Sequence, residues 1–367
     1  MQVNRLAHLN TIRKITLVQF KNYGAATFNF EAPITCITGT NGSGKTNLLD
    51  AVYYLCYTKS YFTAYQQNNM QHGTDGFRVE GVFLNENGKD ELISCKWKAG
   101  KKELFADGVE CEKISDHIGK YAAVMIAPDD IELINDGSEL RRKWIDSVLS
   151  QVDKQYLEYV LQYQKLLQQR NAWLKMNALR PSSDDTQLEY YSNRLTGYGD
   201  YIFERRKAFI ENFTPLLGEF YRQLSNEKES VSITYESDLH SHSLGHWLET
   251  GLQHDLRFQR TLRGIHKDDL DFNFNGKVLK SFGSQGQKKT YLFALKLAQY
   301  AYLSGEQGHK PVLLLDDIFE KLDQDRMKAL LKVIRSEDFA QVILTDTHED
   351  RVKEAFGADA SLDFIRL

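Results

Sequence analysis

The sequence has few cysteines, few prolines and no long apolar run. Its 367 residues include four cysteines, at positions 36, 56, 95 and 111, and five prolines. The cysteines form no Cys-x-x-Cys pair, which excludes a patterned disulfide framework and favours a reducing compartment. No apolar stretch approaches the roughly 20 residues that cross a bilayer, and the first ten residues do not resemble a secretory leader. We therefore expect a cytoplasmic protein without a membrane partner.

The sequence also lacks an excess of positive charge. It carries 46 Lys and Arg against 50 Asp and Glu, a formal net charge of −4. Proteins that coat nucleic acid through bulk charge usually contain a basic domain, so this class is disfavoured. Any binding to an acidic polymer has to be local or conditional. The length and the 42% hydrophobic content indicate a globular chain of two or three domain-sized units.

The two ends of the chain have strand-like patterns. Residues 12–37 alternate between apolar and polar positions, and similar stretches follow at 77–84 and 92–97. These predict a mixed sheet. After residue 254 short strand-like pieces return, and the continuous apolar run 312–315 is typical of a parallel strand that is buried on both faces.

The middle of the chain is helical. From about 150 to 225 the apolar residues recur at a spacing of three and four, which places them on one helix face. The polar segment 180–185 breaks this period, so we predict two antiparallel helices, the second from Leu188 to about Phe213. Residues 226–253 read as a loop, or as a short strand and helix. The sequence thus predicts an α/β core of residues 1–149 and 254–367, interrupted by a helical arm of residues 150–253.

A glycine-rich loop carries the strongest chemical signal. Residues 39–46 match the phosphate-binding pattern G-x-x-x-x-G-K-[ST], and they follow an apolar strand and open a helix, as that motif requires. The backbone N–H groups of such a loop point at phosphates, Lys45 can neutralise the β- and γ-phosphates, and Thr46 can bind magnesium. The residues expected to bind nucleotide here are Gly39, Thr40, Asn41, Gly42, Ser43, Gly44, Lys45, Thr46 and Asn47.

Two carboxylates follow the apolar strand 312–315. Ligands of open α/β sheets collect at the carboxyl ends of the strands. Asp316 is therefore the expected partner of the magnesium ion held by Thr46. Asp317 is placed to orient or deprotonate an attacking water. Alone this pair could be a solvated strand end, but the phosphate loop favours the functional interpretation.

A second glycine-containing segment opens a helix near residue 285. A serine and glycines at a helix start form an anion-binding cradle, although a capped helix would give the same pattern. The residues concerned are Ser284, Gln285, Gly286 and Gln287.

The order of these motifs resembles the head domain of the ABC-type ATPases that act on DNA, the SMC-like group. The chain contains, in this order, the phosphate loop, the helical insertion, the serine-glycine segment, the acidic strand end and the string Glu320–Asp323. Within that group the sequence is most similar to the RecF family of bacterial recombination proteins. The strings that carry this likeness are Phe20–Tyr23, Lys59–Phe62, Arg141-Arg142 with Asp146, Gln169–Asn171 and Gly264–Leu270.

This resemblance implies a fold and a mechanism. The fold would be an ABC-type ATPase head with a P-loop, a mixed sheet and flanking helices, and an inserted arm. ATP and Mg²⁺ would lie between two copies, so that Ser284 and Gly286 of one copy meet the γ-phosphate bound by Lys45 of the other. Asp323 would lie at the dimer seam. His348 resembles the switch histidine, and an ordinary surface histidine stays an equal alternative because it lies several residues past strand 342–344.

Four features depart from the family pattern. Lys21 stands where the family usually has Arg, and Asp50 where it has Glu. Near 127–130, where an ABC head would carry its glutamine loop, there is no glutamine. Asp317 replaces the usual Glu, and its shorter side chain is consistent with slow turnover.

Basic residues are concentrated before the serine-glycine segment. Residues 257–289 contain eight Lys or Arg against three Asp, whereas residues 337–363 contain eight acidic residues against two basic ones. Such a basic stretch could neutralise DNA phosphates without reading sequence. A solvated helix face or internal ion pairs would explain it equally well. The candidate DNA-binding residues are Arg141, Arg142, Arg257, Arg260, Arg263 and Lys267.

The function expected from the resemblance is that of an ATP-dependent recombination mediator. An ATP-bound homodimer would bind duplex, gapped or single-stranded DNA and hydrolyse ATP slowly with stimulation by DNA. It would promote loading of a RecA-type recombinase with RecR- and RecO-type mediators. Another SMC-like ABC ATPase, or a passive ATP-binding scaffold, remains the alternative.

Overall fold

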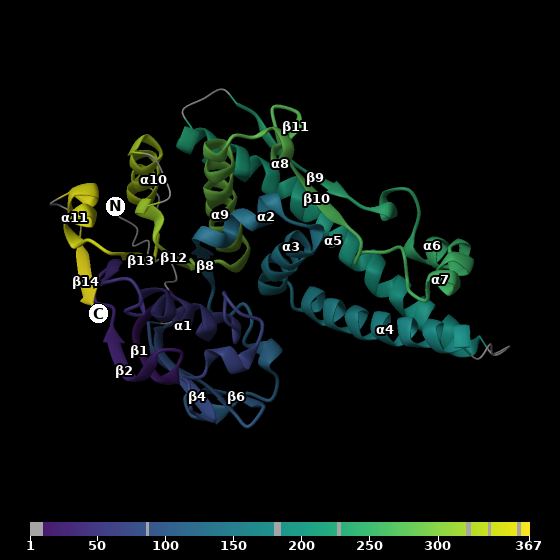
Figure 1. Cartoon of the computed structure of the whole chain (residues 1–367), viewed down its shortest axis with the longest axis horizontal. Helices are drawn as coiled ribbons and strands as arrows, with labels where there is room; N and C mark the ends of the chain where they lie inside the picture. Colours follow the sequence, from purple (N-terminus) through teal and green to yellow (C-terminus); the bar gives the residue numbers. More distant parts are fainter. Residues whose placement is uncertain are drawn as a thin grey trace, which may run out of the picture. The chain divides into compact units, whose positions relative to one another are not determined.

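The computed structural model describes residues 10–85, 88–179, 185–225, 229–320, 324–336, 339–357 and 361–367 (Figure 1). The chain divides into two compact units. Unit 1 comprises Met1–Ile131, Glu219–Lys228 and Gln285–Leu367, and unit 2 comprises Glu132–Gly218 and Glu229–Ser284. These boundaries differ from those expected at 150 and 253. Helix α3 (Ser138–Val152) packs on strand β10 (Asp269–Phe274) of the same unit, and no sequence period reveals such a long-range contact.

Unit 1 contains a five-stranded parallel sheet. Its strand order is β14-β3-β13-β12-β8, and every neighbouring pair is parallel. Three of these strands are buried along their whole length, as expected for a parallel sheet covered on both faces. The carboxyl ends of all five strands lie at one edge. The strands are β3 (Ile34–Thr38), β8 (Ala123–Ile126), β12 (Val312–Leu315), β13 (Gln341–Asp346) and β14 (Leu362–Arg366).

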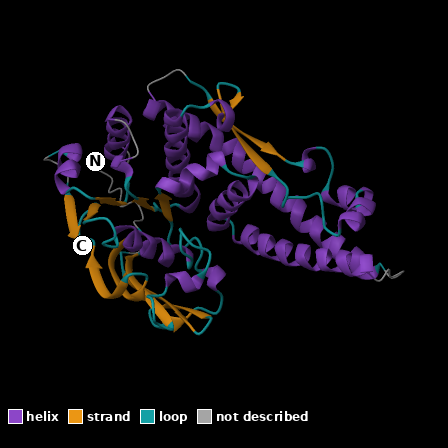
Figure 2. Ribbon diagram, in the orientation of Figure 1, coloured by secondary structure: helices purple, strands orange, loops and turns teal. Residues whose placement is uncertain are grey.

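A second, antiparallel sheet completes the strands of unit 1. The sequence pattern indicated one mixed sheet, and the α/β class is confirmed, but the strands separate into two sheets (Figure 2). The alternation of residues 12–20 places one face of this sheet in the core. In spatial order its strands are β2 (Tyr23–Asn29), β1 (Thr11–Phe20), β4 (Gly76–Leu84), β5 (Asp90–Lys98), β6 (Lys101–Ala106) and β7 (Val109–Glu110).

Helix α1 (Lys45–Tyr57) contacts strands of both sheets of unit 1. Eleven of its 13 residues are buried, which explains why its sequence is apolar on all sides. The helix that carries the phosphate loop is therefore fixed from two directions. The other helices of unit 1 are α9 (Gln285–Gln307), α10 (Gln324–Ser336) and α11 (Glu349–Phe356), with 3-10 helices η1 (Gln66–Asn69), η2 (Ile114–Asp116), η3 (Pro128–Ile131) and η5 (Ile318–Glu320).

Unit 2 is mainly helical. The two predicted long helices are α4 (Lys154–Leu179) and α5 (Thr186–Ser225). Helix α5 continues beyond the predicted end at Phe213, through Pro215, and both Leu217 and Leu224 are buried. Its last turns, from Glu219, belong to unit 1. The remaining elements are α2 (Glu132–Asn135), α3, β9 (Val231–Glu236), η4 (Asp238–His240), α6 (Leu244–Thr250), α7 (Leu252–Phe258), β10, β11 (Lys277–Val278) and α8 (Leu279–Phe282). Across the described ranges, no helix is long and apolar enough to span a membrane.

Candidate nucleotide-binding site

The phosphate loop lies where β3 ends and α1 begins. The Lys45 ammonium donates to the carbonyl oxygens of Gly39, at 3.0 Å, and Thr40, at 3.1 Å, so it lies folded over the loop. The Ser43 hydroxyl is buried and has no hydrogen-bond partner among the described residues. A cation over a glycine-rich loop at a helix N-terminus, with an unsatisfied hydroxyl beside it, fits an anionic phosphate ligand.

The turn between β1 and β2 holds the loop from outside. The Asn22 side chain donates to the Ser43 carbonyl at 3.1 Å and accepts from the Asn47 side chain at 2.8 Å. The Tyr23 hydroxyl donates to the Gly44 carbonyl at 3.0 Å. Gly44 has φ 113°, and a Cβ there would lie 2.7 Å from both Asn22 Nδ2 and Tyr23 Oη, so only glycine fits.

Asp316 reaches the phosphate-loop helix from the end of β12. The Thr46 hydroxyl lies 2.9 Å from Asp316 Oδ1, although the two residues are 270 positions apart in the chain. A second hydroxyl, that of Thr345 on β13, donates to the same oxygen at 2.9 Å. Burial raises the pKa of Asp316, and the bonds from Thr345 and Thr46 oppose that rise. The structure thus places the two expected magnesium ligands side by side.

Thr345 was missed by the sequence analysis. Its hydroxyl donates to Asp316 and accepts from the backbone N–H of Asp317 at 2.9 Å, so it fixes both carboxylate residues. Asp317 has the left-handed backbone with φ 46°, which is unusual for a residue other than glycine. A threonine in a buried strand gives no sequence signal for this role, because β-branched residues are common in every strand.

The donor set fits ATP with a hard divalent cation. A hydroxyl and carboxylate oxygens are the ligands that Mg²⁺ takes, usually alongside phosphate oxygens and water. Thr46 and Asp316 supply such oxygens beside the loop whose backbone and Lys45 suit phosphate. The residues present are therefore compatible with both groups that the sequence predicts.

Two departures from the family pattern contact each other. The Lys21 ammonium lies 2.5 Å from the carboxylate of Asp50 in α1, which is fully buried. Asp50 also accepts from the Ser60 hydroxyl at 2.6 Å. The two residues that depart from the family pattern therefore form an ion pair with each other.

The serine-glycine segment lies at the start of α9, as predicted. Ser284 and Gln285 are exposed, while Gly286 and Gln287 are half-buried. A Cβ at Gly286 would lie 2.7 Å from the Arg326 guanidinium of α10, so a larger residue would displace that side chain. Asp323 lies outside the described residues.

His348 is closer to its strand than the sequence indicated. Strand β13 extends to Asp346, so the histidine follows the strand end by two residues. His348 is exposed and occupies the N-cap position of α11 without a side-chain capping bond, and its backbone N–H donates to Asp346 at 2.6 Å. The geometry permits the switch assignment and does not test it.

The six candidate DNA-binding residues fall into two groups. Arg141 is only 7% exposed, and it donates to both carboxylate oxygens of Asp269 and to the carbonyls of Leu133 and Asp136. These bonds occupy Arg141 within unit 2 and argue against a DNA-binding role.

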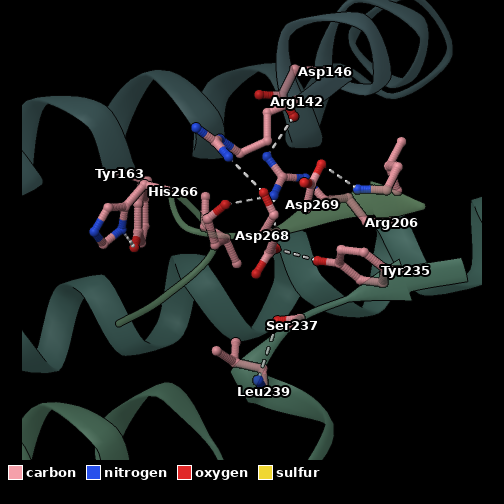
Figure 3. Close-up of polar contacts among 12 residues, drawn as sticks. Arg142, Asp146, Tyr163, Arg206, Tyr235, Ser237, Leu239, His266, Asp268 and Asp269 are labelled. Atoms are coloured by element: carbon pink, nitrogen blue, oxygen red, sulfur yellow. Dashed lines mark hydrogen bonds and ion pairs between the residues drawn. The ribbon is translucent and has the colours of Figure 1, made fainter. Parts of the chain in front are cut away.

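Arg142 and Arg263 are also engaged. Arg142 donates to the carbonyl of Asp268 (Figure 3), and Arg263 pairs with Asp238 and lies 4.0 Å from the Trp247 ring centre. Arg257, Arg260 and Lys267 are exposed. The solvated helix face, given above as an alternative to DNA binding, does not form from Arg257, Arg260 and Arg263, because α7 ends at Phe258.

Comparison with proteins of known sequence identifies a family. Residues 11–362 match the model described as the RecF/RecN/SMC N terminal domain. A DNA replication and repair protein RecF from Flavobacterium johnsoniae is 44% identical over 94% of this chain and 96% of its own length. The corresponding protein of Bacteroides thetaiotaomicron is 40% identical over 95% of both chains.

Solved structures agree with these relatives. The recombination mediator protein RecF-ATP of the RecFOR pathway is 30% identical, with a TM-score of 0.87 and 95% of each chain covered. The same mediator as RecF-ATPrS has a TM-score of 0.87 at 28% identity, covering 98% of this chain and 96% of that one. An Smc head bound to a domain of ScpA, at 17% identity and a TM-score of 0.55, shares the fold.

Proposed function

Because this chain belongs to the RecF family of DNA replication and repair proteins, we propose that it is an ATP-dependent recombination mediator. The observation that carries this proposal is the 2.9 Å contact between Thr46 and Asp316, which joins the phosphate loop to an acidic strand end. The relatives with ATP or ATPrS in their names support ATP as the ligand.

The residues of the site have distinct roles in ATP hydrolysis. The loop amides and Lys45 bind the phosphates, while Thr46 and Asp316 hold Mg²⁺. When bound, Mg²⁺ stabilises the charge that develops on the transferred phosphoryl group. Asp317 orients the attacking water, and His348 contacts the γ-phosphate region. Thr345 keeps both carboxylates in place.

ATP closes a homodimer in this proposal. Ser284–Gln287 of one copy completes the nucleotide site of the other, and Asp323 lies at the seam. The exposure of Ser284 and Gln285 supports this assignment. Hydrolysis then opens the dimer, because the nucleotide contacts both copies only while its γ-phosphate is present.

The closed dimer binds DNA through backbone phosphates. Arg257, Arg260 and Lys267 remain as candidate contacts, since their side chains are exposed. Phosphate contacts carry no base sequence information, so binding is sequence-independent. RecR- and RecO-type mediators and a RecA-type recombinase are the proposed partners.

Phosphate release tests the hydrolytic part of the proposal. Wild type should hydrolyse ATP slowly in the presence of Mg²⁺, and gapped duplex DNA should increase the rate. Asp317→Asn should lose most of this activity while it still binds ATP. Equal rates for the variant and wild type would indicate a passive ATP-binding scaffold.

Sedimentation tests the dimer. Wild type at micromolar concentration should dimerise with ATP and Mg²⁺ and stay monomeric with ADP. Ser284→Arg should bind ATP and fail to dimerise, because a long cation would occupy the shared phosphate site. A wild type that stays monomeric with ATP would contradict the proposed mechanism.

A further inference from the structure

A buried polar cluster lies in unit 1 beside the nucleotide site. Lys296 of α9 is 4% exposed, and its ammonium lies 2.8 Å from the Tyr61 hydroxyl and 3.3 Å from Asp130 Oδ2. Tyr61 in turn donates to Asp130 Oδ1. Burial and the neighbouring carboxylate raise the pKa of Tyr61 well above its ordinary value, so its hydroxyl stays a donor. A buried charged pair of this kind is costly unless every group is satisfied.

Asp130 is connected to Asp316 through one peptide unit. Asp130 Oδ2 accepts from the backbone N–H of Ala127 at 2.8 Å. The carbonyl on the other side of that peptide, of Ile126, accepts from the backbone N–H of Asp316 at 2.9 Å. Asp130 therefore fixes the orientation of the Ile126–Ala127 peptide through its N–H. The carbonyl of the same peptide in turn holds the backbone of Asp316.

The same cluster is connected to the phosphate-loop helix. The backbone N–H of Tyr61 donates to Asp50 Oδ1 at 2.7 Å. Asp50 lies one helical turn after Thr46 in α1, so the two side chains leave the helix on the same side. Tyr61 thus holds α1 through its backbone and holds Asp130 through its hydroxyl.

The loop that carries Asp130 packs against α9 and borders a pocket. The loop 127–131 forms one wall of a pocket of about 120 Å³, whose other walls include Gln285, Leu292 and Asp316. Directed bonds therefore add to the packing of this loop against α9. The ion pair to Lys296 and the bond from Tyr61 supply them.

We infer that Asp130, Lys296 and Tyr61 are positioning residues for the magnesium site. They set the separation between Thr46 on α1 and Asp316 after β12, and Asp130 belongs to the segment 127–130, where the expected glutamine is missing. This inference rests on the proposed ATPase function. Residues that hold metal ligands from behind typically change metal affinity or activity by about 10- to 100-fold when they are replaced.

The test uses a double variant of the full-length protein, because a single substitution would leave a buried charge unpaired. Asp130→Asn with Lys296→Met removes both charges. The matched control is Arg170→Met with Asp255→Asn, which removes an even more buried ion pair in unit 2, where Arg170 Nη1 lies 2.7 Å from Asp255. Binding of a fluorescent ATP analogue and phosphate release are measured across a Mg²⁺ titration, and binding also in EDTA.

The double variant should bind the analogue in EDTA about as well as wild type. Its half-saturating Mg²⁺ concentration should rise by about tenfold or more, and kcat should fall with KM unchanged at excess Mg²⁺. The control should keep the wild-type Mg²⁺ dependence.

A double variant with wild-type Mg²⁺ dependence would overturn the inference and leave the ATPase function intact. Loss of binding in EDTA would also overturn it, since the defect would then lie in the phosphate loop. A wild type that neither responds to Mg²⁺ nor releases phosphate would refute the proposed function itself.

Discussion

Aspartates of low exposure have different kinds of partners in the two units. In unit 2, Asp146 and Asp268 flank the fully buried Arg206, which lies 2.8 and 2.9 Å from them (Figure 3). Tyr235 also donates to Asp268. In unit 1, Asp316 is 4% exposed and is held by the hydroxyls of Thr46 and Thr345. No lysine or arginine of the described ranges forms an ion pair with it.

This difference separates a structural cluster from a ligand site. The Arg206 hub (Asp146, Arg206, Tyr235 and Asp268) supplies its own countercharge and joins α3, α5 and β9 to the segment before β10. Asp316 has neutral partners, so a bound cation can complete its environment. Aspartates therefore stabilise the fold of unit 2, whereas Asp316 of unit 1 is a candidate ligand for a cation.

The largest effect is expected from a variant that removes the cation of the Arg206 hub. Arg206→Met leaves the buried Asp268 and the half-buried Asp146 without their cation, which should lower the free energy of unfolding by about 3–5 kcal/mol. Urea unfolding followed by circular dichroism measures this loss. ATP binding should stay unchanged. Adding Asp146→Asn and Asp268→Asn should recover most of the loss, and no recovery would show that the arginine acts through packing.

In unit 1 we expect the reverse, a loss of turnover with little change in stability. Lys45→Met removes the cation of the phosphate loop, and loss of such electrostatic stabilisation typically reduces turnover by about 10²–10³-fold. Phosphate release measures the effect. The unfolding midpoint should stay close to that of wild type. A variant that hydrolyses ATP normally would place the nucleotide elsewhere.

A smaller effect depends on pH. His266 bonds to Tyr163 Oη at 2.8 Å and to the Thr261 carbonyl, and burial, aided by the charge of Lys267, lowers its pKa to about 4. Its ordinary pKa is 6.5, so between these values the unfolded chain binds a proton that the folded chain does not. The neutral His266 therefore contributes fully to the free energy of unfolding above pH 6.5. This contribution, at most about 3 kcal/mol, is lost as the pH falls towards 4.

Thermal unfolding at several pH values checks this contribution. His266→Gln should be less sensitive to pH than wild type between pH 6.5 and 4. If both proteins lose stability equally over that interval, the histidine is not the group that titrates.

The smallest effect concerns DNA. Lys267→Ala and Arg260→Ala should each weaken binding to duplex DNA at every sequence, and each should reduce the slope of log affinity against log salt by about 1. Binding across a salt series in the presence of ATP measures the slope. Lys175→Ala, an exposed lysine of α4, is the control and should leave the slope unchanged. Equal slopes for all variants would remove this segment from the DNA contact.

Much of the nucleotide site was predictable because its parts are contiguous. The phosphate loop is flanked by a strand and a helix within 25 residues, and the acidic strand end is one apolar run. Both lie as expected, and the α/β class follows from the same patterns. The proximity of Thr46 to Asp316 also follows, since parallel strands present their carboxyl ends at one edge.

The rest depends on contacts that leave no periodic trace. Thr345 lies in a strand and Lys296 in a helix, and no local pattern shows that they contact Asp316 and Asp130, which lie elsewhere in the sequence. Arg141 looked like part of a basic surface, yet it lies buried against Asp269, whose position 128 residues later no local pattern reveals. For the same reason, the bounds of the two compact units differ from the domain boundaries expected from the sequence.

The most direct test of the contrast is calorimetric titration of ATP into wild type and Asp316→Asn, with Mg²⁺ and with EDTA. Wild type should bind ATP at least about tenfold more tightly with Mg²⁺, and the variant should lose that gain while it keeps its affinity in EDTA. If Asp316→Asn retained the full gain from Mg²⁺, the carboxylate would be structural, like those of the Arg206 hub, and the assignment of the site would be wrong.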